Sequence, residues 1–205
     1  RCEPRASHPV AFSANFVLAH EWFIGSVPTE LLLRYADALA DAGVQRVDVN
    51  MGLFPWLDGD APTIKKYDDV IRRIRDRGLG LVINPQYSGM RHVVRSMEEW
   101  EEAALRVYPM IASRYHPEIF IVVHEPGPVM NDRMKLDTGP ERWSEFVRKA
   151  VAAVKRASPA TRCGAGVLAD VPAEEAFFDA FARLQELDVL TVDVYSMPGL
   201  QAATR

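Results

Sequence analysis

The sequence predicts an α/β fold in which parallel strands alternate with helices, and three recurring features carry this prediction. Short apolar runs rich in β-branched residues are each followed by a segment whose apolar residues recur every three or four positions. Glycine ends several helical segments just before the next apolar run begins. The segments that follow the apolar runs are longer and carry His, Trp, Asn, Asp and Tyr. This alternation is typical of a parallel sheet with helices packed outside it.

The first half of the chain contains three predicted strands and two predicted helices. The strands are expected at residues 14–18, 44–50 and 79–84. The first helix is expected at residues 29–42, and the second contains the apolar stripe from Ile64 to Ile74. Gly43 and Gly78 follow the two helices, as expected for glycine in the left-handed conformation that ends a helix.

The second half continues the pattern with three more strands and three more helices. Ser96 to Glu99 forms a capping box that begins the third helix. Pro140 and Pro172 suit the first turns of the fourth and fifth helices. The strands are expected at residues 118–124, 162–168 and 189–195.

The short loops before the strands and long polar loops after them favour a (β/α)8 fold of the TIM-barrel type, with its site at the carboxyl ends of the strands. About six βα units are present, against eight in a closed barrel. We therefore expect one domain over residues 1–205 that is incomplete at its C-terminus. An open doubly wound sheet is the alternative, but no glycine-rich phosphate-binding motif follows the first strand.

The composition bounds the possible partners and locations. Hydrophobic residues make up 48% of the 205 residues, enough for a large core, and the net charge of −4 argues against nucleic acid or an anionic membrane surface as a partner. No apolar run is long enough to span a bilayer. The chain begins Arg1-Cys2-Glu3 without a signal segment, so a processed secreted or periplasmic protein is favoured and a fragment stays open. Cys2 and Cys163 could form a disulfide or be unrelated thiols.

The strand at 118–124 delivers Glu125 into a turn, Pro126 to Pro128. A Glu at the tip of a barrel strand can have its pKa raised by partial burial, which suits a general acid. The alternative is a Glu that pairs with a loop Arg or caps a turn. His124 precedes it and either orients a substrate and tunes Glu125, or is a satisfied histidine at the rim.

Other polar and aromatic residues follow the neighbouring strands. Asp193 and Tyr195 lie two apart and so share a face of the sixth strand, as Asp48 and Asn50 do on the second. Tyr195 could then donate a hydrogen bond to a catalytic carboxylate. Trp56 could stack on a sugar ring or simply anchor its loop. A similar polar and aromatic rim follows the third strand: Asn84, Gln86 and Tyr87.

A metal site would need His20 and Glu21 to join His124 and Glu125. His20 and Glu21 lack helical metal-ligand spacing, and only the assumed barrel brings the two pairs together. We therefore expect no metal and no other cofactor.

Three segments together resemble the clan A glycoside hydrolases, the group of cellulases, mannanases and related retaining β-glycosidases. Residues 35–47 resemble their passage from the first helix to the second strand, residues 121–126 the fourth-strand motif that ends Asn-Glu-Pro, and residues 192–195 the sixth strand. The resemblance implies that Glu125 is the acid/base and that Tyr195 hydrogen-bonds the nucleophile.

The chain also departs from this family. His124 stands where the family has the Asn that contacts the sugar 2-hydroxyl, and Asp48 stands at the place of its Arg. The family's nucleophilic Glu lies on a seventh strand. Retaining enzymes need two carboxyl groups about 5–5.5 Å apart, so we expect a longer native protein to supply the second.

The sequence therefore predicts a glycoside hydrolase that cleaves β-glycosidic bonds of a polysaccharide or oligosaccharide by a retaining mechanism. Candidate substrate-binding residues share a place at the ends of the strands: His124, Asn50, Trp56, Asp48, Gln86 and Tyr87. A non-catalytic carbohydrate-binding barrel and a metal-dependent barrel hydrolase are the alternatives.

Overall fold

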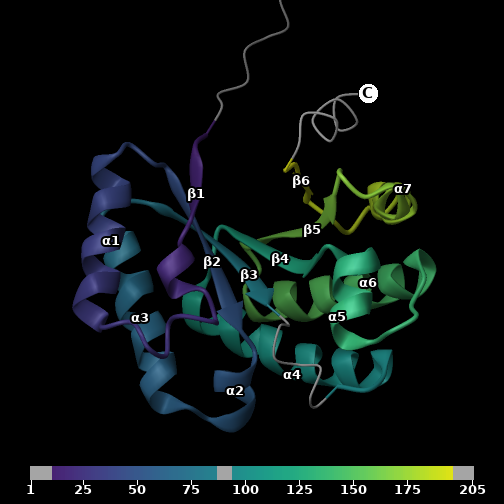
Figure 1. Ribbon diagram of the computed structural model, residues 1–205, viewed down its shortest axis with the longest axis horizontal. Coiled ribbons are helices and arrows are strands. Elements are labelled where there is room, and N and C mark those ends of the chain that lie inside the picture. Colours follow the sequence, from purple (N-terminus) through teal and green to yellow (C-terminus); the bar gives the residue numbers. More distant parts are fainter. Residues whose placement is uncertain (1–10, 87–93, 196–205) are drawn as a thin grey trace, which may run out of the picture.

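The computed structural model of the chain describes residues 11–86 and 94–195 (Figure 1). Its six strands form one sheet: β1 Ser13–Asn15, β2 Arg46–Gly52, β3 Gly80–Gln86, β4 Ile119–His124, β5 Arg162–Leu168 and β6 Val189–Asp193. All neighbours pair in parallel, and their order in the sheet follows their order in the chain. A doubly wound sheet would reverse this order at a switch point. The predicted barrel type is therefore confirmed, with six parallel strands of which the first five are each followed by a helix in the described residues.

Helices separate the strands along the chain. Their bounds are α1 Thr29–Asp41, α2 Phe54–Asp58, α3 Ala61–Asp76, α4 Met97–Tyr115, α5 Asp132–Met134, α6 Pro140–Ala157 and α7 Glu175–Ala182, with short helical turns η1 Val17–Ala19, η3 Pro126–Asn131 and η4 Pro172–Glu174. Gly43 and Gly78 have φ angles of 80° and 72°, and the Ser96 side chain accepts a 3.2 Å hydrogen bond from Glu99 N, as the predicted helix ends require. No helix in the described ranges has the length and apolarity needed to cross a membrane.

The helices pack against the outer face of the curved sheet. Figure 1 shows α1 and α3 beside the β1–β2 end and α6 and α7 beside the β4–β5 end. Alternate residues of β2 point outward into this layer, and Val47, Val49 and Met51 are fully buried there. This outward face holds most of the apolar core, since the buried aromatic residues of α4 and α6 belong to the same cluster.

The inner face of the sheet, unlike the apolar outer face, is largely polar. A cavity of about 690 Å³ lies along it, lined by residues of β1, β2, β3, β4 and β6. Asp48, Asn50, Asn84, His124 and Asp193 all contribute to its lining. The sheet thus presents a polar inner surface to the interior of the partial barrel, with β1 and β6 as its two edges.

Candidate active site

An irregularity in β4 determines which side chain reaches the cavity. Ile121 pairs with Gly164 of β5, whereas Val123 pairs with the very next residue, Ala165. Val122 is therefore an extra residue, and a bulge of this kind shifts the alternation of side chains between the faces. Before the bulge Ile119 and Ile121 line the cavity, and after it His124 does so.

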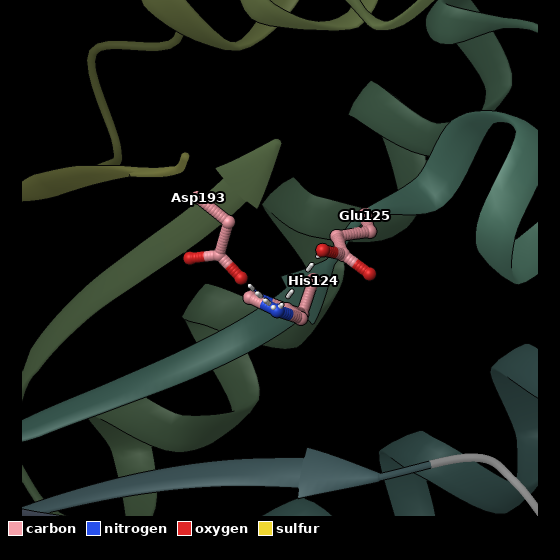
Figure 2. A group of neighbouring side chains, drawn as sticks. All are labelled: His124, Glu125 and Asp193. Carbon is pink, nitrogen blue, oxygen red and sulfur yellow. Dashed lines mark ion pairs between the residues drawn. The ribbon is translucent and has the colours of Figure 1, made fainter. Parts of the chain in front are cut away.

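His124 lies between two carboxylates (Figure 2). Its Nε2 atom is 2.9 Å from Asp193 Oδ2 and 3.8 Å from Glu125 Oε1. Gly166 of β5 makes room for the imidazole, because a Cβ atom there would lie 2.8 Å from His124 Nδ1. The three side chains come from β4, its C-terminal tip and β6, so the parallel sheet brings them to one end of the barrel.

Glu125 has an unusual backbone for its residue type. Its φ angle is +50°, in the left-handed region, and its side chain is largely buried. Glu125 N donates to Gly166 O over 3.0 Å, and Glu125 O accepts from Met130 N over 3.0 Å. A non-glycine residue in this region costs about 1–3 kcal/mol, and such residues concentrate at functional sites.

Mutual charge stabilises the His124–Asp193 pair. Burial alone would lower the pKa of His124, but the hydrogen bond and negative charge of Asp193, helped by Glu125 and Asp48, outweigh burial and raise it. Burial alone would raise the pKa of Asp193, but the hydrogen bond and charge of His124 outweigh it and lower the pKa. The two opposite shifts favour an ion pair, imidazolium with carboxylate.

Asp48 lies on the inner face of β2. Burial raises its pKa to about 7; the positive charge of His124 opposes this rise and the negative charge of Asp193 adds to it. The Oδ1 atom of Asp48 is buried without a hydrogen-bond partner among the described residues, and so are Asn50 Oδ1 and Asn84 Oδ1. Three buried acceptors without a partner in the described part of the chain therefore gather beneath the cavity.

Asp48 and Asn50 line the cavity whereas Val49 between them is fully buried, so the prediction that they share a face of β2 is confirmed. β6 ends at Asp193, and every residue from Thr191 to Tyr195 lines the cavity, so the shared face of Asp193 and Tyr195 stays a prediction.

Tyr195 and Trp56 differ in how well they suit their predicted roles. Tyr195 is exposed, and its hydroxyl lies 3.4 Å from Asp193 Oδ2, so it contacts a carboxylate of the site. Trp56 is 7% exposed, lies within α2, and packs edge-on against Tyr115 with ring centroids 5.8 Å apart. The predicted stacking of Trp56 on a sugar is therefore wrong, because the five-residue helix α2 turns its ring into the core.

Two other predicted residues lie at the limit of the described structure. Gln86 ends β3, at the same end of the sheet as Glu125, but its side chain lies outside the described part. Tyr87 lies outside the described residues altogether. Their predicted binding roles stay predictions.

Sequence reasoning missed two residues near the site. Glu174 is 1% exposed, and its Oε1 accepts a 2.7 Å hydrogen bond from Gly127 N, in the turn after Glu125. Trp22 is 58% exposed, with its ring 4.6 Å from that of His20. Its neighbour Glu21 donates from N to Asn50 O over 3.1 Å, which places this loop at the carboxyl end of β2. The position of Trp22 after the first strand could have indicated it, whereas nothing in the sequence singles out Glu174.

The four-residue metal set of the alternative function, His20, Glu21, His124 and Glu125, does not assemble among the described residues. Within the described ranges, the group of potential ligand atoms close enough to share a cation is His124, Glu125 and Asp193, within 4.8 Å of one another. His20 and Glu21 are not part of it. In the structure, the short His124–Asp193 contact is that of a hydrogen-bonded ion pair.

Comparison with known proteins identifies the fold. The chain resembles GH5_18 from Streptomyces cattleya, solved in complex with GlcNAc, with a TM-score of 0.60 and 14% identity over 80% of this chain and 45% of that one. It resembles a Bacteroidetes-affiliated GH5 cellulase with a TM-score of 0.60 and 15% identity, over 91% of this chain and 59% of that one. It resembles the β-glycosidase BGL167 with a TM-score of 0.61 and 13% identity, over 92% of this chain and 66% of that one.

This chain therefore spans less than two thirds of the length of each of these structures. No protein-family profile matches the sequence, and no curated protein matches it. At these identities the likeness establishes the fold that the chain shares with solved glycoside hydrolases.

Proposed function

We propose that this chain is the larger part of a (β/α)8 glycoside hydrolase that cleaves β-glycosidic bonds of an oligosaccharide or polysaccharide with retention of configuration. The observation that carries this proposal is the position of Glu125. Its carboxyl group lies at the carboxyl end of a parallel barrel, on a strained backbone and beside an ion pair. Catalytic groups of this fold occupy that end of the strands.

In the proposed mechanism Glu125 first acts as an acid. A carboxylate nucleophile attacks the anomeric carbon, the bond to the leaving oxygen breaks, and that oxygen takes the proton of Glu125. Water then attacks the same carbon, Glu125 takes the proton of the water, and the bond to the nucleophile breaks. His124 holds its N–H toward Asp193 and faces Glu125, so it orients the acid/base.

We assign the nucleophile to a seventh strand in a longer native protein, which would pair with the free edge of β6. Asp193 also lies within 4.8 Å of the Glu125 and His124 ligand atoms. Its carboxylate, however, is engaged by His124 at 2.9 Å and lies near the Tyr195 hydroxyl. Its role is therefore to hold His124, and the family resemblance assigns the contact with the nucleophile to Tyr195.

Two features support a carbohydrate substrate. The polar side chains of Asp48, Asn50 and Asn84 line the cavity and can form hydrogen bonds with sugar hydroxyls. The exposed ring of Trp22 offers an aromatic face near the end of β2, where a pyranose could stack. Two structural neighbours were solved with GlcNAc and with Manb1-4GlcNAc, which supports a β-linked pyranoside. Secretion stays a prediction.

Substitution of Glu125 by Gln in the full-length protein tests the proposal. Aryl β-glucosides and β-mannosides with good and poor leaving groups are the probes. Loss of the acid slows substrates with poor leaving groups by about 100-fold or more, whereas 2,4-dinitrophenyl glycosides need little protonation and lose less. Exposed Glu175→Gln is the matched control. Equal rates for Glu125→Gln and wild type on every substrate would refute the acid/base role.

A non-catalytic carbohydrate-binding barrel is the second candidate, favoured by His124 and Asp48 at positions where the resembled family has Asn and Arg. Calorimetry with cello- and manno-oligosaccharides separates the two. Binding without any product from the full-length wild-type protein supports this candidate over the hydrolase.

A further inference from the structure

Glu174 is a buried acid outside the cavity lining that directly contacts the turn after Glu125. It ends η4, in the connection between β5 and α7, and is 1% exposed. Its Oε1 accepts the hydrogen bond of Gly127 N at 2.7 Å. Its Oε2 is buried and has no hydrogen-bond partner among the described side chains and backbone. A fully buried acid in hydrogen-bond contact with the backbone of this turn needs an explanation.

The turn is shaped to receive this carboxyl group. A Cβ atom at Gly127 would lie 2.5 Å from Glu174 Oε1 and 3.1 Å from Phe177 Cε2. Only glycine allows the backbone to approach this closely. The absence of a side chain at Gly127 therefore lets the Glu174 carboxyl group reach the backbone of the turn.

The contact lies two residues from Glu125. The left-handed backbone of Glu125 is fixed by its hydrogen bonds to Gly166 O and from Met130 N. Both of these bonds are between backbone groups. The bond from Gly127 N to Glu174 adds a side-chain anchor to the same turn. Loss of that anchor would leave a strained conformation with less to hold it.

The surroundings of Glu174 also favour its neutral form. Burial raises its pKa to about 7, while the backbone groups of Gly127 and Leu168 oppose the shift. The charged groups that face it come from β4: the negative charge of Glu125 adds to the shift and His124 opposes it. Below about pH 7 Glu174 therefore holds its proton next to the proposed acid/base.

We propose that Glu174 is a positioning residue: it accepts the hydrogen bond of Gly127 N and thereby holds the turn that positions Glu125. The neutral carboxyl group accepts the amide hydrogen bond without placing a second negative charge near Glu125. The effect on catalysis rests on the proposed function, whereas the effect on the turn does not.

Amide hydrogen exchange of the full-length protein tests the anchoring directly. Glu174→Ala is expected to speed exchange at Gly127 and Met130 by about tenfold or more, because a hydrogen bond to a buried group is lost. Glu174→Gln keeps an acceptor oxygen and is expected to exchange like wild type. The exposed neighbour variant Glu175→Gln is the control. Unchanged exchange in Glu174→Ala, or equal acceleration in Glu174→Gln, would overturn the proposal. Should Glu174→Ala fail to fold, Glu174→Asp takes its place: it keeps the acid but is one methylene too short to reach Gly127 N, so faster exchange is expected and wild-type exchange would overturn the proposal.

Kinetics with 4-nitrophenyl β-glycosides test the catalytic consequence. We expect Glu174→Ala to lower kcat about tenfold with little change in KM, and Glu174→Gln to restore kcat at acidic pH. Above about pH 7, Glu174→Gln should exceed wild type, because the wild-type carboxyl ionises there. A loss in Glu174→Gln as large as in Glu174→Ala at acidic pH contradicts the proposal. If the wild-type protein hydrolyses none of these substrates, the proposed function fails while the exchange experiment still tests the anchor.

Discussion

His124 is the residue whose identity most affects this site, because its N–H faces two carboxylates at once. Its contact with Asp193 is short and its contact with Glu125 is longer. An amide at this position could donate a hydrogen bond but could not carry a charge. The imidazole can therefore carry a positive charge where the resembled family has a neutral group, and Asp193 raises its pKa and so favours that charged form.

Substitution of Asp193 by Asn should lower the pKa of His124. Burial disfavours the charged imidazole, and without the negative charge of Asp193 this effect of burial would prevail. We expect the pKa of His124 to fall below its wild-type value, as measured by NMR titration of the His124 ring. Exposed Asp179→Asn is the control and should leave the titration unchanged. A His124 ring that titrates alike in wild type and Asp193→Asn would contradict the ion pair.

Glu174 should make the protein less stable as the pH rises. Its pKa is raised from an ordinary 4.5 to about 7, so its stabilising contribution is complete below about pH 4.5 and is lost as the pH rises through 7. The shift corresponds to about 3 kcal/mol. In urea denaturation, the stability of wild type relative to Glu174→Gln should fall by this amount between about pH 4.5 and pH 8. A difference that does not vary with pH would show that Glu174 is ionised in the folded protein.

At this scale the sequence predicted some side chains and not others. Asp48 and Asn50 could be placed because strand alternation puts them on one face of β2. Glu174 could not be found, since its role depends on the contact of a loop with a turn 47 residues away. Trp56 was misplaced because a short helix with a proline in its first turn replaces the loop that the sequence indicated.

At the scale of the element, the bulge in β4 is the feature that builds the site. Regular alternation would have directed Val123 inward and His124 outward. The extra residue Val122 reverses this, and its carbonyl oxygen accepts a 2.9 Å hydrogen bond from the buried Tyr108 hydroxyl of α4. The helix thus satisfies a backbone group of the bulge. The sequence indicates the strand but not the bulge, because an apolar run shows no alternation from which a shift could be detected.

Removal of the Tyr108 hydroxyl should weaken the bulge. Tyr108→Phe leaves the buried Val122 carbonyl without that hydrogen bond, at a cost of about 1–3 kcal/mol in the free energy of unfolding. Chemical denaturation measures this loss. Ser113→Ala removes an exposed hydroxyl from the same helix and should change stability by less than about 0.5 kcal/mol. Equal stabilities of Tyr108→Phe and Ser113→Ala would argue against the role of Tyr108.

The whole molecule is a six-stranded part of a barrel whose strands follow chain order. Its element order could be predicted almost completely, because the βα alternation and the glycine helix ends are local signals. Closure of the barrel could not, since it depends on strands beyond the sixth. Within residues 11–86 and 94–195, β1 and β6 are the edge strands of the sheet, and this and the polar inner face are consistent with further strands that complete it.

Addition of the native downstream sequence should stabilise the protein. Open edge strands expose unpaired backbone groups and promote association between chains. Residues 1–205 alone are therefore expected to self-associate and to unfold at a lower temperature than the longer protein. Light scattering and thermal denaturation of the two measure this. A monomeric 1–205 chain as stable as the longer protein would contradict incomplete closure.

The acid/base role of Glu125 is the central claim, and chemical rescue of Glu125→Ala in the full-length protein tests it most directly. The probes are 2,4-dinitrophenyl β-glucoside and β-mannoside, whose leaving group departs without a proton, in the presence of sodium azide. If Glu125 is the acid/base, the nucleophile still forms the glycosyl-enzyme, and azide in the vacated space attacks the opposite face. The predicted result is a faster reaction that gives the β-glycosyl azide, identified by NMR. Either the α-glycosyl azide, which would make Glu125 the nucleophile, or hydrolysis at the wild-type rate without any azide product would contradict the account.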